Sequence, residues 1–482
     1  MAADQRRAAS LIRGALLFGA GALSAVIVMQ LFERGSDERS DRTAAANSSR
    51  ISGVGGDSPA SADQGGRQTV VGDPLSRMSE VISVGDRDAR MERLRHLGEE
   101  LGERDPVGAL ELAVRIPDTE DRLEFLRAVF GKWAAKDPNA ALAAALKYPA
   151  GTIRGETVDA ALGAWAARDP RAALAWLDTN LSGPMKEEAL VTVTMKWAGA
   201  NPEAAAAWFV STGSTSESVL TGLINAWTDL DPHAAARWIE SLRDERSKII
   251  GRIALVLEWS NQNPAEASAY ATPHLAAEGG ADLATAMINA WGTTDPQSAA
   301  HWLDSLPPGK VREQAAGTLA TIWAAHDVTA ATQWATRLPE GDLKDGVIDQ
   351  IATTWGAIEP QKALSWLETL PIDETRKEAT RGALDSWAAT DANGLNNWIS
   401  SQTPGAIADQ ARMSLGHVQI DSDPPKAMET ALGISEPNMR RDELVKYYRR
   451  WSRRDASGAT TWLQSAPLTA DLKGTLASSV RR

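Results

Sequence analysis

An acidic residue or asparagine recurs at intervals of about 32 residues along most of this 482-residue chain. A row of carboxylates could bind metal ions or act as acids and bases in catalysis. Proline follows the recurring residue in nine of twelve places, and Asp or Asn before Pro is a typical helix start, because the side chain accepts hydrogen bonds from the first turn. We therefore expect the row to cap helices: Asp105, Asp137, Asp169, Asn201, Asp231, Asn263, Asp295, Asp327, Glu359, Asp391, Asp423 and Asp455.

The other reactive side chains form no recognisable catalytic pattern. The six histidines occupy unrelated positions without metal-ligand spacing, and the chain has no cysteine. No phosphate-binding glycine loop follows a strand pattern, and no serine lies in a nucleophile motif. The sequence therefore predicts a protein that is not an enzyme and needs no metal or cofactor.

One basic segment, MRRDELVKYYRRWSRRD at residues 439–455, contrasts with the net charge of −13. Helical spacing places four of its cations on one face with a tyrosine beside them. Clustered arginines bind carboxylate and phosphate groups, so this face could bind an acidic protein, an anionic lipid or a glycan. The alternative is a solvated helix face without a ligand. The candidate partner-binding residues are Lys446, Tyr447, Arg450, Arg453 and Arg454.

The elements that would position these residues are indicated by the tryptophans. Ten of the 18 tryptophans follow a 32-residue ruler, with one interval of 30 residues and one doubled: Trp133, Trp165, Trp197, Trp227, Trp259, Trp291, Trp323, Trp355, Trp387 and Trp451. The other eight each lie 11 residues after a ruler position: Trp176, Trp208, Trp238, Trp302, Trp334, Trp366, Trp398 and Trp462. A strict period of this length is typical of stacked structural repeats.

Each repeat reads as an αα-hairpin. Apolar residues precede the ruler position at helical spacing, and after the cap a second helix of about three turns follows. We expect the tryptophans in the core, because burying one indole removes about 150–250 Å² from water and many exposed ones would form large apolar patches. Twelve repeats are anchored at Leu101, the ten ruler tryptophans and Gln419; the repeat at Gln419 has lost both tryptophans.

The motifs WAARDPRAALAWL from Trp165 and WGTTDPQSAAHWL from Trp291 carry a resemblance to known repeats. The chain resembles the tetratricopeptide-like superfamily, and more closely the WAxxDPxAAxxW repeats of membrane-anchored bacterial proteins, from about Leu75 onward. Its period of 32 residues differs from the 34 of tetratricopeptides, so their peptide-binding positions do not transfer. The resemblance implies an α-solenoid that serves as a protein-interaction scaffold.

The N-terminus predicts a membrane anchor. Residues 1–13 form a short tail, and the uncharged residues 14–32 are long enough for one transmembrane helix; the alternative is a cleaved signal peptide. Residues 33–72 are rich in Ser, Gly, Asp and Arg and predict a disordered linker, and residues 73–482 form the repeat domain. The basic residues flanking the span tie in number, and the short tail favours the repeat domain outside the cytoplasm.

These patterns together predict an all-α superhelix of αα-hairpins, anchored in a bacterial inner membrane with its repeats in the periplasm. The expected function is a non-catalytic scaffold that binds protein partners along its helical surface. The alternative is an envelope protein that binds carbohydrate or peptidoglycan through exposed repeat tryptophans. The acidic net charge argues against nucleic acid as a partner.

Overall fold

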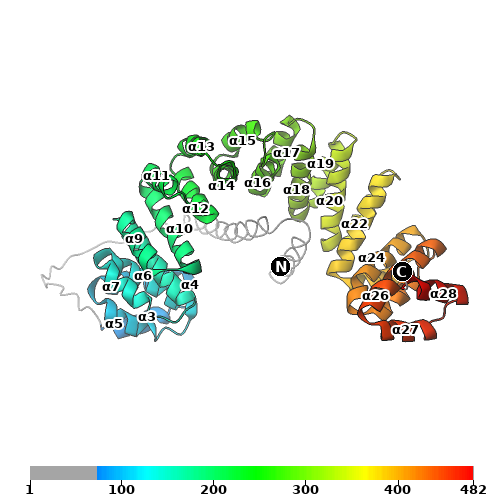
Figure 1. The fold of residues 1–482 in the computed structure, drawn as a ribbon, viewed down its shortest axis with the longest axis horizontal. Coiled ribbons are helices and arrows are strands. Elements are labelled where there is room, and N and C mark those ends of the chain that lie inside the picture. Colours follow the sequence, from blue (N-terminus) through cyan, green and yellow to red (C-terminus); the bar gives the residue numbers. More distant parts are fainter. Residues whose placement is uncertain (1–72, 481–482) are drawn as a thin grey trace, which may run out of the picture. The chain divides into compact units, whose positions relative to one another are not determined.

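The computed structural model describes residues 73–480, which are all-α (Figure 1). This range holds 26 α-helices and one 3₁₀ turn, without a β-strand, so the all-α part of the predicted fold class is confirmed. The expected tail (1–13), transmembrane helix (14–32) and linker (33–72) lie outside the described residues. None of the helices within residues 73–480 is both long and apolar enough to cross a membrane.

Backbone contacts divide the chain into two compact units, with the boundary between Gly279 and Gly280. The N-terminal unit, residues 73–279, contains a short helix followed by six hairpins. Its helices are α3 (Pro74–Ile82), α4 (Arg87–Arg104), α5 (Pro106–Ala113), α6 (Thr119–Lys136), α7 (Pro138–Ala145), α8 (Thr152–Ala166), α9 (Pro170–Asn180), α10 (Gly183–Ala200), α11 (Pro202–Thr212), α12 (Glu217–Thr228), α13 (Pro232–Ser241), α14 (Glu245–Gln262), α15 (Pro264–Ala271) and η1 (Thr272–His274).

The C-terminal unit, residues 280–480, contains six hairpins and a closing helix, α28. Its helices are α16 (Gly280–Trp291), α17 (Pro296–Ser305), α18 (Lys310–His326), α19 (Val328–Arg337), α20 (Asp342–Ile358), α21 (Pro360–Leu367), α22 (Glu374–Thr390), α23 (Ala392–Ser401), α24 (Ala406–Ser422), α25 (Pro424–Leu432), α26 (Pro437–Arg454), α27 (Ala456–Ser465) and α28 (Ala470–Ser479).

Within each unit the longer first helices of successive hairpins lie side by side (Figure 1). In the N-terminal unit these are α4, α6, α8, α10, α12 and α14; in the C-terminal unit they are α16, α18, α20, α22, α24 and α26. Each shorter second helix contacts the first helix of its own hairpin and, within its unit, the first helix of the next one, as α9 contacts both α8 and α10. The chain is thus a repeat-like array of hairpins, as an α-solenoid requires.

The tryptophans pack into this array, as predicted. Seven of the ten ruler tryptophans are buried and the other three are half-buried, whereas six of the eight second-helix tryptophans are half-buried. In seven hairpins the two indoles contact each other, with ring centroids 5.5 Å apart for Trp323 and Trp334 and 6.5 Å apart for Trp291 and Trp302. The indole pair therefore joins the two helices of one hairpin, across the turn that the cap begins.

The repeat that lacks both tryptophans keeps the contact in a different form. Gln419 replaces the ruler tryptophan, Thr430 replaces the second one, and the Thr430 hydroxyl donates to Gln419 Oε1 at 2.7 Å. One hydrogen bond contributes about 1 kcal/mol, whereas an aromatic pair adds about 0.5–1.5 kcal/mol to the burial of two indoles. The joint between α24 and α25 therefore replaces the indole pair with a hydrogen bond.

Close approach of two first helices depends on a glycine directly after the ruler position. A Cβ atom at Gly356 in α20 would lie 2.5 Å from the carbonyl oxygen of Ala383 in α22, and one at Gly102 in α4 would lie 2.5 Å from that of Val129 in α6. Backbone cannot move aside as a flexible side chain can. These two glycines therefore set the spacing of their helix pairs.

We expect Gly356→Ala to lower the free energy of unfolding by about 1–3 kcal/mol, because the added methyl group must push α22 away. Gly346→Ala is the matched control, since a Cβ at this position in the same helix meets no atom within 4 Å. The control should be neutral or stabilising by about 0.5–1 kcal/mol, as alanine favours helix. Urea unfolding followed by circular dichroism measures both; equal effects would contradict the packing role.

Candidate functional site

The recurring acidic residues are helix caps. In eleven of the twelve repeats the side chain at the recurring position accepts a hydrogen bond from the backbone N–H three residues later, as Asp327 accepts from Ala330 at 3.0 Å. Glu359 makes no such bond and instead contacts Lys362 and Trp355. Among residues 73–480, no three His, Asp or Glu side chains are grouped so that they could hold a metal ion.

A cap needs an acceptor atom but no negative charge, and this difference can be tested at Asp327. We expect Asp327→Asn to change the free energy of unfolding by less than about 0.5 kcal/mol, because Asn201 and Asn263 fill the same role. Asp327→Ala should cost about 1 kcal/mol. Thermal unfolding of the three proteins measures this. If Asn were as damaging as Ala, the carboxylate charge would have a role that capping does not explain.

A second periodic feature, which the sequence analysis missed, is a row of arginines eleven residues before the ruler position. Arg122, for example, donates to the carbonyl oxygen of Ile116 at 2.7 Å, and so ties the start of a first helix to the end of the preceding hairpin. The row was visible in the sequence as basic residues at a constant offset. Six of these arginines donate to the carbonyl six residues earlier: Arg90, Arg122, Arg154, Arg312, Arg376 and Arg440.

One carboxyl group in the N-terminal unit has a strongly shifted pKa. Burial of Asp159 in α8, together with the negative charges of Glu188 and Glu156, raises its pKa to about 6, although Thr192 donates a hydrogen bond to it. Raised carboxyl pKa values occur in active sites. Here the surrounding groups are two carboxylates and a hydroxyl, so burial and repulsion account for the shift without a nucleophile or a base.

Folding raises the pKa of Asp159 from its ordinary 3.8 to about 6, so between these pH values the carboxyl is protonated in the folded chain and ionised in the unfolded chain. The folded chain therefore loses stability as pH rises from about 4 to 6. We expect Asp159→Asn to raise the free energy of unfolding by about 1 kcal/mol near neutral pH, a value reduced for the carboxyl's contact with water, and to have little effect below about pH 4. Urea unfolding at both pH values measures the difference. The exposed Glu429→Gln is the control; an Asp159→Asn effect independent of pH would contradict the assignment.

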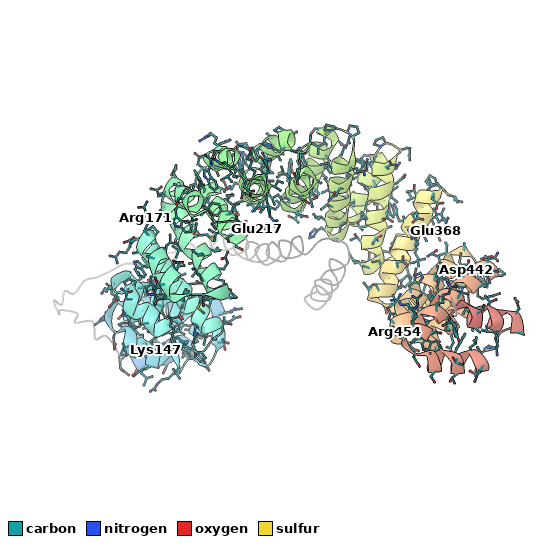
Figure 2. All side chains as sticks on the ribbon, viewed as in Figure 1. Lys147, Arg171, Glu217, Glu368, Asp442 and Arg454 are labelled. Atoms are coloured by element: carbon teal, nitrogen blue, oxygen red, sulfur yellow. The ribbon has the colours of Figure 1, made fainter. Side chains whose placement is uncertain are left out.

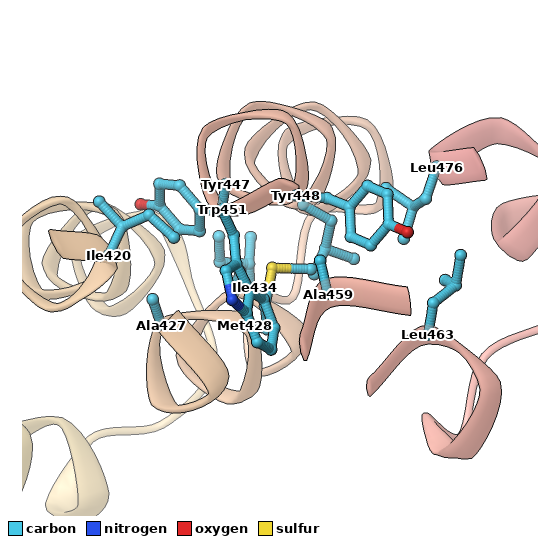
Figure 3. Packing of buried hydrophobic residues seen from close by; sticks show 12 residues of the cluster. Ile420, Ala427, Met428, Ile434, Tyr447, Tyr448, Trp451, Ala459, Leu463 and Leu476 are labelled. Carbon is cyan, nitrogen blue, oxygen red and sulfur yellow. The ribbon is translucent and has the colours of Figure 1, made fainter. Parts of the chain in front are cut away.

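The structure places the five candidate partner-binding residues in or near α26, and one of them is not accessible. Tyr447 is only 2 % exposed and its hydroxyl donates to the carbonyl oxygen of Met413, so its side chain is packed inside the protein and not presented to a partner. Figure 3 shows its ring in the core of the C-terminal hairpins, with Ile420 and Trp451 nearby. Helical spacing alone did not show that Tyr447 faces α24, one turn away from the solvated cations.

Three of the four cations form ion pairs within the chain. Lys446 binds the buried carboxylate of Glu443 at 2.5 Å, and that carboxylate also contacts His417. Arg450 and Arg454 both bind Asp421 in α24, at 2.5 and 2.8 Å. Two guanidinium groups on one exposed carboxylate brace α26 against α24. They keep a net positive charge, but part of their binding capacity is already used.

Arg453 is exposed and contributes to the same positive surface. The ion pair of the neighbouring Arg454 with Asp421 has a counterpart elsewhere in the array, where Lys136 of α6 pairs with Glu103 of α4 in the same way. The basic segment therefore does structural work that recurs in other repeats. Its remaining capacity for an acidic partner stays a prediction.

A groove that sequence patterns did not indicate lies between α9 and α11 in the N-terminal unit. It has a volume of about 820 Å³, within the range of ligand-binding pockets. Leu190 of α10 and the half-buried Trp208 of α11 form its apolar surface, and the buried Leu174 and Leu177 of α9 lie beneath it. Its edges are accessible to water, since Ala175, Asp178, Ala207, Ser211 and Thr212 are exposed.

The polar lining of this groove is mostly occupied by local interactions. Lys186 pairs with Asp178 at 2.6 Å, and the hydroxyls of Ser211 and Thr212 donate to carbonyl oxygens of their own helix. Arg171, labelled on the surface in Figure 2, also lines the groove; its guanidinium carbon lies 6.0 Å from the centre of the Trp197 ring. Two cations and one carboxylate leave the groove with one net positive charge.

Fold and site together define the class of an αα-hairpin repeat protein with an open, mainly apolar surface groove. No family model matches the chain, and no curated protein matches it either. The class therefore rests on the helices, their packing and the groove.

Proposed function

We propose that the protein is a membrane-anchored, non-catalytic scaffold that binds segments of partner proteins on its helical-repeat surface. The observation that carries this proposal is the groove between α9 and α11, which combines the half-buried Leu190 and Trp208 with the guanidinium of Arg171. Interfaces concentrate aromatic and arginine side chains at their centres, and helical repeats use the surfaces between successive units for binding. The scaffold needs no cofactor.

The proposal includes the anchor and the compartment predicted from the N-terminus. A span at residues 14–32 would hold the repeats at a bacterial inner membrane, on the periplasmic side, at the end of a linker of about 40 residues. The superhelical path and kinship with the WAxxDPxAAxxW repeats belong to the same proposal. They agree with the repeat-like packing of hairpins in each unit.

A second candidate function is binding of envelope carbohydrate or peptidoglycan. It is favoured by the six half-buried tryptophans of the second helices, since sugars stack on partly exposed indoles, and Trp208 among them lines the groove. The hydroxyls nearest to Trp208 argue against it, because Ser211 and Thr212 donate to their own helix and are not free to follow a sugar ring. Protein partners remain the better match.

Photo-crosslinking from the groove can separate the two functions in cells. A photoreactive phenylalanine derivative at Ala175 or Ala207 places the reactive group on opposite walls of the groove. Ala269 of α15 is the matched control, because it is exposed, belongs to the same unit and occupies the same position in its repeat. We expect one protein partner to be crosslinked from both walls and not from Ala269.

Mass spectrometry of the crosslinked products identifies the class of ligand. Muropeptide or oligosaccharide products from both walls would support the carbohydrate function instead. Equal products from the groove and from Ala269 would contradict a role for the groove. Alkaline phosphatase fused to the C-terminus should be active if the repeats are periplasmic, and inactivity would refute that location.

A further inference from the structure

We infer that the groove between α9 and α11 binds a peptide segment of a partner protein in which one Asp or Glu lies next to apolar side chains, with Arg171 binding the carboxylate. This inference rests on the proposed scaffold function and specifies its ligand. The groove supplies apolar area from Leu190 and Trp208, and the exposed Arg171 lines it.

The charge of Arg171 has no acidic partner within residues 73–480. Its guanidinium lies over the Trp197 ring, whereas the other groove cation, Lys186, is paired with Asp178. A guanidinium held against an aromatic face keeps its N–H groups available and loses less freedom when it binds, so it suits a bidentate contact with a carboxylate. The groove therefore complements one negative charge.

The repeat itself does not require an arginine at this place. Arg171 is six residues after ruler Trp165, and no other repeat has Arg or Lys at this offset. A residue needed to stack one hairpin on the next would recur in other repeats, as the helix caps do and as the arginines equivalent to Arg122 do. The equivalent residues are Val107, Asn139, Glu203, His233, Ala265, Gln297, Thr329, Gln361, Asn393, Pro425 and Ser457.

The shape of the groove favours a segment of a polypeptide. Small apolar ligands bind in pockets that bury most of their surface, but Ala175, Ala207 and Ser211 leave this groove open along its edges. A peptide can place two or three side chains on Leu190, the indole of Trp208 and the exposed alanines while its backbone stays in contact with water. An amphipathic helix laid between two helices is a common form of this recognition.

A displayed library of random heptapeptides, selected on the full chain, tests the ligand chemistry. We expect selected peptides to carry Asp or Glu flanked by apolar residues, and to bind Arg171→Glu at least tenfold more weakly and Arg171→Lys with an intermediate loss. The Arg171→Glu chain should fold, because the next repeat has Glu203 at this position. Arg237→Glu, an exposed arginine of α13 outside the groove, is the matched control and should bind normally.

A second variant reports on the groove without changing its charge. Ala207→Trp fills the groove from an exposed position, and Ala269→Trp is its control. If Ala207→Trp abolishes binding of peptides that lack an acid and Arg171→Glu does not weaken them, the inference about the ligand is overturned and the scaffold function stands. If Ala207→Trp weakens no selected peptide, and weakens only the binding of a glycan or of a second copy of the chain, both the inference and the scaffold function are overturned.

Discussion

The contact between the two helices of each hairpin is the interaction on which the rest of the array depends. Neither helix is stable alone, because short helices need tertiary packing, and the second helices have only 8 to 11 residues. An indole at the end of the first helix and another eleven residues later contact each other at 5.5–6.5 Å. The aspartate cap fixes the turn between them, so the indole pair and the cap together define one rigid hairpin.

The same tryptophans also link hairpins. In two repeats the residue six positions after a ruler tryptophan contacts the next one: Arg171 lies over Trp197, and the His233 ring contacts Trp259 edge-on at 4.8 Å. In these two places the indole therefore contacts its own hairpin and the preceding one. Near Gln419 and Thr430, the ion pairs of Asp421 with Arg450 and Arg454 connect α24 to α26.

Most of the fold could be predicted because its determinants are local and periodic. The Asp-Pro caps, the apolar spacing before each ruler position and the tryptophan period indicated twelve hairpins, and the structure has them. Tyr447 could not be placed correctly, because the residue spacing within its helix does not show which side of the helix α24 covers. The groove was equally hidden, since Leu174 of α9 and Trp208 of α11 come from different hairpins and meet only after packing.

The groove illustrates how a periodic scaffold can carry a non-periodic function. Eight residues after every ruler position the side chain is buried, and it is alanine in eleven repeats and Leu395 in the other; twelve residues after, it is buried and apolar in all twelve. Those positions hold the second helix against its neighbours and cannot vary in polarity. Arg171, which lines the groove, is six residues after the ruler, and this position ranges from valine through glutamate to arginine among the repeats. Substitutions at this position can therefore change the ligand of the proposed groove site without changing the array. A side chain such as Arg171, which forms no ion pair with another described residue, is the kind of feature by which such a site is recognised.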